Sequence, residues 1–293
     1  MSDPQEFGVA VEGGELRVCL WPGTGPVVLA AHGITANALA FTRLARELGG
    51  RVRLAAPDLR GRARSNALPG PYGMAAHAAD LIAVAGHLGV PRVTLVGHSM
   101  GGFVVASTAA AYPDRVAGAL LVDGGVVLPV PPEADVDAVL QAVIGPAMQR
   151  LGMTFPSVEA YVGFFRAHPA LKDGWSADIE AYVVRDFVGG GSSCSLEAVR
   201  ADATDTLLRT DTVDAVRRLT CPARLMWADR GLQNEKQGLY DPGRLAAAGL
   251  DPTRIAVEHV AGVNHYSILF DDDAVARVAG RILEMAGDHT ARL

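Results

Sequence analysis

The sequence predicts an α/β protein with a mostly parallel sheet that carries helices on both faces. Apolar runs with the length and composition of buried parallel strands occupy residues 27–31, 52–56, 92–96 and 116–122. Longer, alanine-rich stretches of helical length lie between them, at residues 36–48, 74–88 and 100–111. Because strands alternate with helices in this way, we expect βαβ units, whose strands run parallel.

The remaining elements of the predicted sheet lie at the two ends of the chain. Two β-rich runs, on either side of Gly13 and Gly14, predict an opening hairpin. Far along the chain, residues 222–227 and 254–260 are again strand-like, and residues 272–285 predict a closing helix. The four central strands end at His32, Pro57, Gly97 and Asp123.

Residues 128–219 contain no convincing buried strand and predict a helical insert. The insert holds many of the aromatic side chains of the chain: Phe155, Tyr161, Phe164, Phe165, Trp175, Tyr182 and Phe187. Each of them alone is more often a core residue, but together they suit a lid over a hydrophobic pocket. We therefore predict a core made of residues 1–127 and 220–293 and a lid made of residues 128–219.

Composition and charge exclude several classes of protein. The chain has 293 residues, of which 49% are hydrophobic, so it can bury a sizeable core and is not intrinsically disordered. A formal net charge of −6 leaves no basic footprint for nucleic acid. No apolar run has the length of a membrane span, and the first residues lack a signal-peptide pattern. The three dispersed cysteines predict neither disulfides nor a metal site, and we expect a soluble, cytoplasmic protein.

The strongest chemical signal is the sequence Gly-His-Ser-Met-Gly at residues 97–101, which fits the pattern G-x-S-x-G. A predicted strand enters this motif and a predicted helix leaves it. Ser99 is therefore expected on a tight turn that exposes its hydroxyl above the sheet. The two glycines suit such a turn, because the neighbouring backbones come too close for larger side chains. We predict that Ser99 is a nucleophile rather than a simple helix-capping serine.

A nucleophilic serine needs a general base and donors for the developing oxyanion. Among the eight histidines, His265 is the preferred base, because it follows the last predicted strand by a short loop, residues 262–264, and precedes the last helix. His98 adjoins the serine in the chain and is poorly placed to face it. For the oxyanion we predict the backbone N–H groups of Ile34 and Met100. His32 is expected to shape the loop of the oxyanion hole rather than to react.

Together these pieces resemble the α/β-hydrolase superfamily, in particular its lid-bearing serine hydrolases. The resemblance is carried by His-Gly at residues 32–33, Asp-Leu-Arg-Gly-Arg-Ala-Arg-Ser at 58–65, the serine motif, and Gly-Val-Asn-His at 262–265. It extends over nearly the whole chain, although Ala63 replaces a glycine of the D-x-R-G-x-G-x-S pattern. It implies an eight-stranded, mostly parallel sheet flanked by helices, with a helical lid (cap) inserted after the sixth strand. It also implies that Asp58 and Arg60 brace the fold.

Two aspartates compete for the role of the acid that orients His265. Members of the superfamily usually carry this acid in a pattern like W-G-x-x-D, but here Gly231 occupies its place and Asp229 lies two residues earlier. Some lid-bearing relatives carry the acid at the end of the strand before the insert, where this chain has Asp123. We favour Asp123, whose carboxylate would accept the Nδ1–H of His265. Asp229 remains the alternative.

A serine at the position where dehalogenases and epoxide hydrolases of this fold carry an aspartate predicts acyl transfer to water. We expect an esterase- or lactonase-like enzyme that cleaves an ester or lactone of a fairly large apolar small molecule through an acyl-enzyme. Carbon–carbon bond hydrolysis with the same triad is an alternative, as is a ligand-binding protein of this fold without turnover. No metal, organic cofactor, nucleic-acid or membrane partner is predicted, and the oligomeric state is left open.

Overall fold

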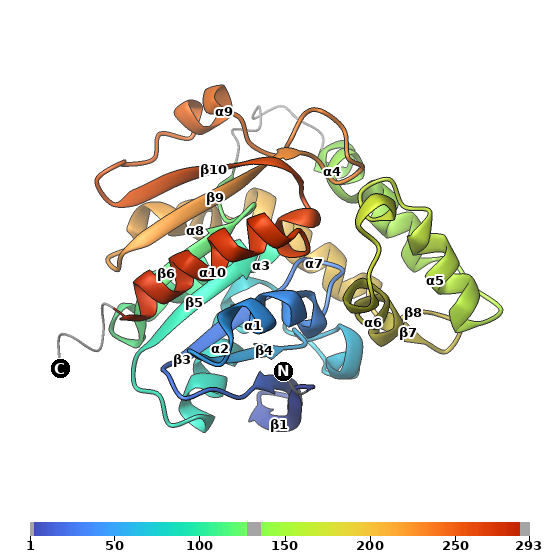
Figure 1. Cartoon of the computed structure of the whole chain (residues 1–293), viewed down its shortest axis with the longest axis horizontal. Coiled ribbons are helices and arrows are strands. Elements are labelled where there is room, and N and C mark those ends of the chain that lie inside the picture. The colour runs from blue at the N-terminus through green and yellow to red at the C-terminus, as the bar shows by residue number, and fades with distance from the viewer. Residues whose placement is uncertain (1–2, 128–135, 288–293) are drawn as a thin grey trace.

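The computed structural model describes residues 3–127 and 136–287, apart from several side chains between residues 136 and 144. Its centre is an eight-stranded sheet with the order β1-β2-β4-β3-β5-β6-β9-β10 (Figure 1). The strands are β1 (Gln5–Val11), β2 (Gly14–Trp21), β3 (Val27–Ala31), β4 (Arg53–Pro57), β5 (Val93–His98), β6 (Val116–Val122), β9 (Ala223–Arg230) and β10 (Ile255–Asn264). Only the β1–β2 and β2–β4 pairs of this sheet are antiparallel, so the predicted mostly parallel sheet flanked by helices is confirmed.

Helices cover both faces of the sheet (Figure 1). On one face lie α2 (Met74–His87) and α3 (Met100–Ala111), and on the other α1 (Thr42–Leu48) and α10 (Asp272–Gly287). The central strands β3, β5 and β6 are buried along their whole length. Successive side chains of a strand point to opposite faces of the sheet, and helices cover both faces here. The side chains on both faces must therefore be apolar. This is why these strands are continuous apolar runs in the sequence.

Most predicted elements agree with the structure to within a few residues, and two differ for identifiable reasons. The predicted helix over residues 36–48 is divided into a 3-10 turn (Ala38–Phe41) and α1. The Asn37 side chain begins the 3-10 turn by accepting a hydrogen bond from Leu39 N at 3.0 Å. The last strand, β10, continues to Asn264 through an irregular pairing after Val260. His265 therefore follows a strand directly and not a loop.

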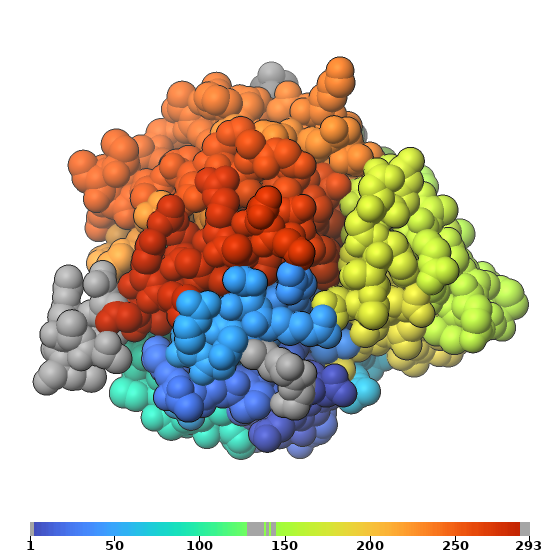
Figure 2. All heavy atoms as spheres, in the orientation of Figure 1, coloured from blue at the N-terminus to red at the C-terminus, as the bar shows by residue number. Residues whose placement is uncertain are grey.

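Between β6 and β9 the chain leaves the sheet and forms a mainly helical insert. Its elements are α4 (Val136–Leu151), α5 (Val158–Arg166), α6 (Ala177–Asp186), the short strands β7 (Phe187–Val188) and β8 (Gly191–Ser192), α7 (Leu196–Leu208) and α8 (Thr210–Val213). Figure 2 shows the α5–α6 region, in yellow and green, as a lobe that projects from the side of the molecule. The predicted start of the lid, residue 128, lies outside the described residues. Near its predicted end, Ala215, Val216 and Leu219 pack into the core with α3.

Buried ion pairs join the insert to the sheet. Arg185 of α6 donates to Asp58 at 2.7 Å and also pairs with Glu6, while Asp202 of α7 pairs with Arg62 at 2.5 Å. Asp58 also accepts a hydrogen bond from the backbone of the turn before α1. The insert is therefore held against the core by charged groups that are themselves removed from water. No helix within the two described ranges is both long and apolar enough to cross a membrane.

Candidate active site

Ser99 stands at the turn between β5 and α3, in a backbone conformation that is rare for a residue with a side chain. Its φ is 57° and its ψ is −123°, and the side chain is only partly buried. The turn is held by a hydrogen bond from Ser99 N to Val122 O at 3.0 Å. A Cβ added to Gly101 or Gly124 would overlap neighbouring backbone atoms, so the close packing around the turn requires glycine at both. These contacts fix the position of the serine.

His265 and Asp123 are joined by a buried hydrogen bond. The distance from His265 Nδ1 to Asp123 Oδ2 is 2.6 Å, and the two side chains are 3% and 0% exposed. Asp123 follows β6 and His265 follows β10, with β9 between these strands in the sheet. The second carboxylate oxygen of Asp123 accepts a hydrogen bond from Ala228 N of β9 at 3.1 Å. The structure thus brings the predicted base together with the favoured one of the two candidate acids.

Asp229, the other candidate acid, is bound elsewhere. Its carboxylate accepts hydrogen bonds from His259 Nε2 and Gly262 N, both on β10, and its side chain is 34% exposed. Partial burial opposes its charge, but the Gly262 N–H and the His259 ring hold the pKa of Asp229 below its usual value. Asp229 has no hydrogen bond to His265 among the described contacts. Its carboxylate instead binds residues of β10, the strand at the edge of the sheet.

His98 links the strand of the serine to the segment of the base. Its Nε2–H donates to the backbone oxygen of His265 at 2.7 Å, and the two rings lie 4.7 Å apart between centroids. Burial, together with the neighbouring His265, lowers the pKa of His98 to about 3, so its ring is neutral. His98 therefore positions the main chain of His265, in agreement with the prediction that it does not face the serine as a base.

The Ser99 hydroxyl has no hydrogen-bond partner among residues 3–127 and 136–287. The serine–histidine contact of a working triad is therefore not formed in this structure. Such contacts are commonly long in unliganded enzymes and shorten in the complex with substrate. His265 lies beside the ring of His98, the residue that precedes Ser99 in the chain.

The loop after β3 adjoins Ser99. A Cβ added to Gly33 would lie 3.3 Å from the Cβ of Ser99 and 3.6 Å from its Oγ. Within the described part of the chain, neither the Ile34 N–H nor the Met100 N–H donates to another residue. Met100 begins α3, where the helix dipole favours negative charge. The two amides predicted for the oxyanion hole are thus free to donate.

His32 holds this loop in place. Its Nδ1–H donates to Gly33 O at 2.8 Å, and its Nε2 accepts from Leu59 N at 2.9 Å. Burial lowers the pKa of His32 to about 3, so the imidazole stays neutral and both nitrogens remain engaged. His32 is a structural part of the loop, as its sequence position predicts.

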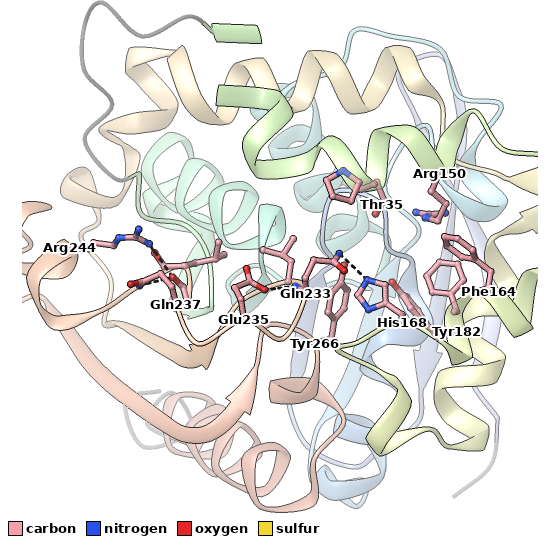
Figure 3. Close-up of a pocket in the computed structure, with 16 residues that line it drawn as sticks. Thr35, Arg150, Phe164, His168, Tyr182, Gln233, Glu235, Gln237, Arg244 and Tyr266 are labelled. Carbon is pink, nitrogen blue, oxygen red and sulfur yellow. Dashed lines mark hydrogen bonds between the residues drawn. The ribbon is translucent and has the colours of Figure 1, made fainter. Parts of the chain in front are cut away.

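A cavity of about 480 Å³ lies between the insert and the core (Figure 3). Ser99, His265, Ile34 and Met100 are not among the residues that line it. Thr35 and Tyr266, which follow Ile34 and His265 in the chain, form part of its wall. Its apolar lining consists of Pro146, Ala147, Phe164, Phe165, Leu232 and Leu239. Its polar lining consists of Thr35, Arg150, His168, Tyr182, Gln233, Glu235, Gln237, Arg244 and Tyr266, and Gly238 completes the wall. Of the seven aromatic residues singled out in the insert, Phe164, Phe165 and Tyr182 line this cavity.

Several of these lining residues were not predicted from the sequence. Thr35 and Tyr266 could have been found by their adjacency to the predicted site residues. Arg150 and Gln233 carry no local signal, because only the packing of the insert against the core brings them to the cavity. Among the described residues, no group of three or more His, Cys, Asp or Glu side chains could hold a metal ion.

Comparisons with known proteins agree with this architecture. The sequence profile of a family described as "alpha/beta hydrolase fold" matches residues 26–168. A 2-(acetamidomethylene)succinate hydrolase of Mesorhizobium japonicum is 29% identical over 247 residues, which cover 83% of each chain. The lipase LipV of Mycobacterium tuberculosis is 39% identical over 115 residues, 39% of this chain and 43% of the lipase. The chain spans only 40% to 43% of the first curated relatives it matches.

A solved structure shows the same fold over almost the whole chain. The crystal structure of E-2-(acetamidomethylene)succinate hydrolase aligns with a TM-score of 0.77 at 24% identity, covering 96% of this chain and 98% of the other. At this identity the likeness shows the fold alone. Together with the family profile, it confirms the predicted α/β-hydrolase fold.

Proposed function

Because the chain belongs to the α/β-hydrolase superfamily, we propose that it is a serine hydrolase that transfers an acyl group from an ester or lactone to water. The observation that carries this proposal is the buried hydrogen bond from His265 to Asp123, formed at the sheet edge where Ser99 stands on its strained turn. The curated relatives include a lipase and a hydrolase of a succinate derivative. Both names describe hydrolytic enzymes, and they do not name the same substrate.

In the proposed reaction, Asp123 accepts the Nδ1–H of His265 and thereby fixes the tautomer whose Nε2 carries a lone pair. His265 Nε2 takes the proton of Ser99 as the serine oxygen attacks the substrate carbonyl. The backbone N–H groups of Ile34 and Met100 stabilise the oxyanion. His265 then gives its proton to the departing alkoxide, which leaves an acyl-serine.

The second half of the reaction repeats these roles with water. His265 removes a proton from water as the water attacks the acyl carbonyl, and the oxyanion again lies between the two amides. Collapse of the intermediate returns the proton to Ser99 and releases the acid. No other chemical group is required. The apolar wall formed by Phe164, Phe165 and Leu232 would contact the apolar part of the substrate.

Hydrolysis of a panel of 4-nitrophenyl esters and lactones by the purified protein tests this proposal. We expect turnover by the wild type and loss of nearly all of it in Ser99→Ala, on the order of 10⁶-fold if the triad acts as a unit. Ser107→Ala is the matched control, because Ser107 lies on the same helix, α3, and should leave turnover unchanged. Absence of hydrolysis by the wild type on every ester and lactone, or full activity of Ser99→Ala, would contradict the proposal.

A further inference from the structure

Arg150 lines the insert side of the cavity with part of its hydrogen-bonding capacity unused. The residue is 6% exposed, and its Nη1 donates to Tyr161 Oη at 2.6 Å and to Asp186 Oδ2 at 3.1 Å. Among the described residues, its Nε and Nη2 donate to nothing. Figure 3 shows the guanidinium turned toward the part of the cavity bounded by Thr35 and Phe164. Nε and Nη2 are not among the fully buried side-chain atoms without a partner, so they keep some accessible surface and can reach a ligand.

The carboxylate of Asp186 neutralises the positive charge of Arg150 only in part. Asp186 also accepts hydrogen bonds from Tyr161 Oη at 2.5 Å, Ser192 Oγ at 2.8 Å and Ser193 Oγ at 2.7 Å. Its negative charge is therefore shared among several donors, of which Arg150 contributes one nitrogen. Burial opposes the charge of Arg150, but Tyr161 and Asp186 raise the pKa of the guanidinium above its usual value. Arg150 stays a cation.

Hydroxyl donors surround the same part of the cavity. Thr35, Tyr182 and Tyr266 line it, and within the described part of the chain their hydroxyls have no hydrogen-bond partner. Burial raises the pKa of Tyr182 and of Tyr266, so both phenols are neutral and able to donate. His168 is uncharged as well, because burial and then the nearby Arg150 lower its pKa. This end of the cavity therefore offers many donors and a positive charge.

Few acceptors compete for these donors. Among the described residues that line the cavity, the only carboxylate is that of Glu235, which is exposed. Its Oε2 accepts from Gln233 N at 2.7 Å, within its own loop. Besides burial, the same carboxylate helps to raise the pKa of Tyr266, but it accepts no hydrogen bond from Arg150.

We propose that Arg150, Thr35, Tyr182 and Tyr266 form an anion subsite that binds a carboxylate carried by the substrate. This inference rests on the proposed acyl hydrolysis and names its substrate class: esters or lactones that carry a second, ionised carboxylate. Nε and Nη2 form one edge of the planar guanidinium, and this edge matches the two oxygens of a carboxylate in a bidentate pair. The single charge of Arg150 suits a singly charged group, and the aromatic walls suit the carbon chain between the carboxylate and the reacting carbonyl.

Two pairs of esters test the subsite on the wild-type protein. Each pair compares a charged ester with a neutral ester of the same shape. The first pair is 4-nitrophenyl hydrogen adipate and 4-nitrophenyl 6-methylheptanoate. The second pair is 4-nitrophenyl hydrogen suberate and 4-nitrophenyl 8-methylnonanoate. After subtraction of uncatalysed hydrolysis, we expect kcat/KM to favour the charged member of at least one pair by about tenfold or more. Equal or higher kcat/KM for the neutral member in both pairs overturns the proposal.

A matched pair of variants assigns the preference to Arg150. Arg150→Lys keeps a cation beside Asp186 but loses the Nε–Nη2 edge, and should lower the charged-to-neutral ratio about tenfold. Arg166→Lys is the control: Arg166 also pairs with a carboxylate, Glu180 at 2.6 Å, and lies over the Trp175 ring, but it is exposed and does not line the cavity. Its ratio should not change. The same fall in both variants, or in neither, contradicts the role of Arg150.

Binding of adipate and suberate, measured by calorimetry, separates this inference from the proposed function. If no ester is cleaved, acyl hydrolysis fails, but dicarboxylate binding to the wild type that is weakened in Arg150→Lys still supports the subsite. If neutral esters are cleaved and neither dicarboxylate binds, the subsite fails and hydrolysis stands. If Arg150→Lys does not fold, the ester pairs and the dicarboxylate binding measured on the wild type still test the subsite.

Discussion

At the proposed reacting centre, one carboxylate decides which nitrogen of His265 is available to the serine. Asp123 is completely buried, and both of its oxygens are occupied, one by His265 Nδ1 and the other by Ala228 N. The backbone of β9 thus holds the carboxylate on one side while the histidine takes the other. With Nδ1 engaged, only Nε2 remains to accept a proton from Ser99.

Replacing each candidate acid by its amide tests this arrangement. Asp123→Asn keeps the size of the side chain but favours the wrong tautomer of His265, so we expect kcat to fall on the order of 10⁴-fold. Asp229→Asn is the matched control and should change kcat by no more than about twofold, as surface substitutions usually do. The measurement is steady-state hydrolysis of one 4-nitrophenyl ester by both variants. Collapse of only the Asp229 variant would reverse the assignment.

Site residues differ in how far the sequence can predict them. Ser99 and Asp123 each follow a strand that is evident as an apolar run, and His265 follows the last predicted strand, so the sequence places all three at the carboxyl ends of the strands. The resemblance to a known superfamily narrows the choice of acid to two residues. Arg150 could not be predicted, because its partner Asp186 lies 36 residues away in the chain. The Nε–Nη2 edge of its guanidinium can bind a ligand only because the fold places it beside a cavity. Contacts of this kind depend on packing and leave no local pattern.

Among the elements of the insert, α6 is joined to the core by a buried charged pair. Arg185 near its end is 9% exposed and reaches both Asp58, beyond β4, and Glu6 of β1. Asp58 in turn accepts from Ala38 N at 2.9 Å. The guanidinium of Arg185 therefore joins the insert to β1 and to Asp58, and the carboxylate of Asp58 in turn binds the turn before α1.

Removal of this guanidinium should destabilise the whole chain. We expect Arg185→Ala to lower the free energy of unfolding by about 3–5 kcal/mol, because it leaves the buried carboxylate of Asp58 without its partner. Arg166→Ala, which breaks the exposed pair with Glu180 in the same insert, should cost less than about 1 kcal/mol. Urea unfolding followed by circular dichroism measures both variants. Equal losses for the two variants would show that the buried pair has no special role.

Elements of the core are easier to predict than elements of the insert. The predicted bounds of β3, β6 and α3 coincide with the observed ones, because strands buried on both faces and an alanine-rich helix have clear composition signals. In the insert, the sequence predicts helices but not their bounds or the two-residue strands β7 and β8. These strands are too short to carry a periodic pattern.

For the whole molecule, the position of the candidate site follows from the order of the strands. The chain passes from β3 to β4 on one side and returns to β5 on the other side of β3. The helix after β3 therefore lies on one face of the sheet and the helix after β5 on the opposite face (Figure 1). A crevice opens at such a switch point, at the carboxyl ends of the strands. Ile34 and Ser99 lie in the two loops that border it.

Reaction of the intact protein with a fluorophosphonate probe, followed by peptide mapping, tests the central claim most directly. A serine activated by a histidine attacks such a probe, whereas an ordinary surface serine does not. The account predicts a single labelled residue, Ser99, with labelling abolished in Ser99→Ala and strongly slowed in His265→Ala. An unlabelled wild type, or equal labelling of the wild type and Ser99→Ala, would contradict it.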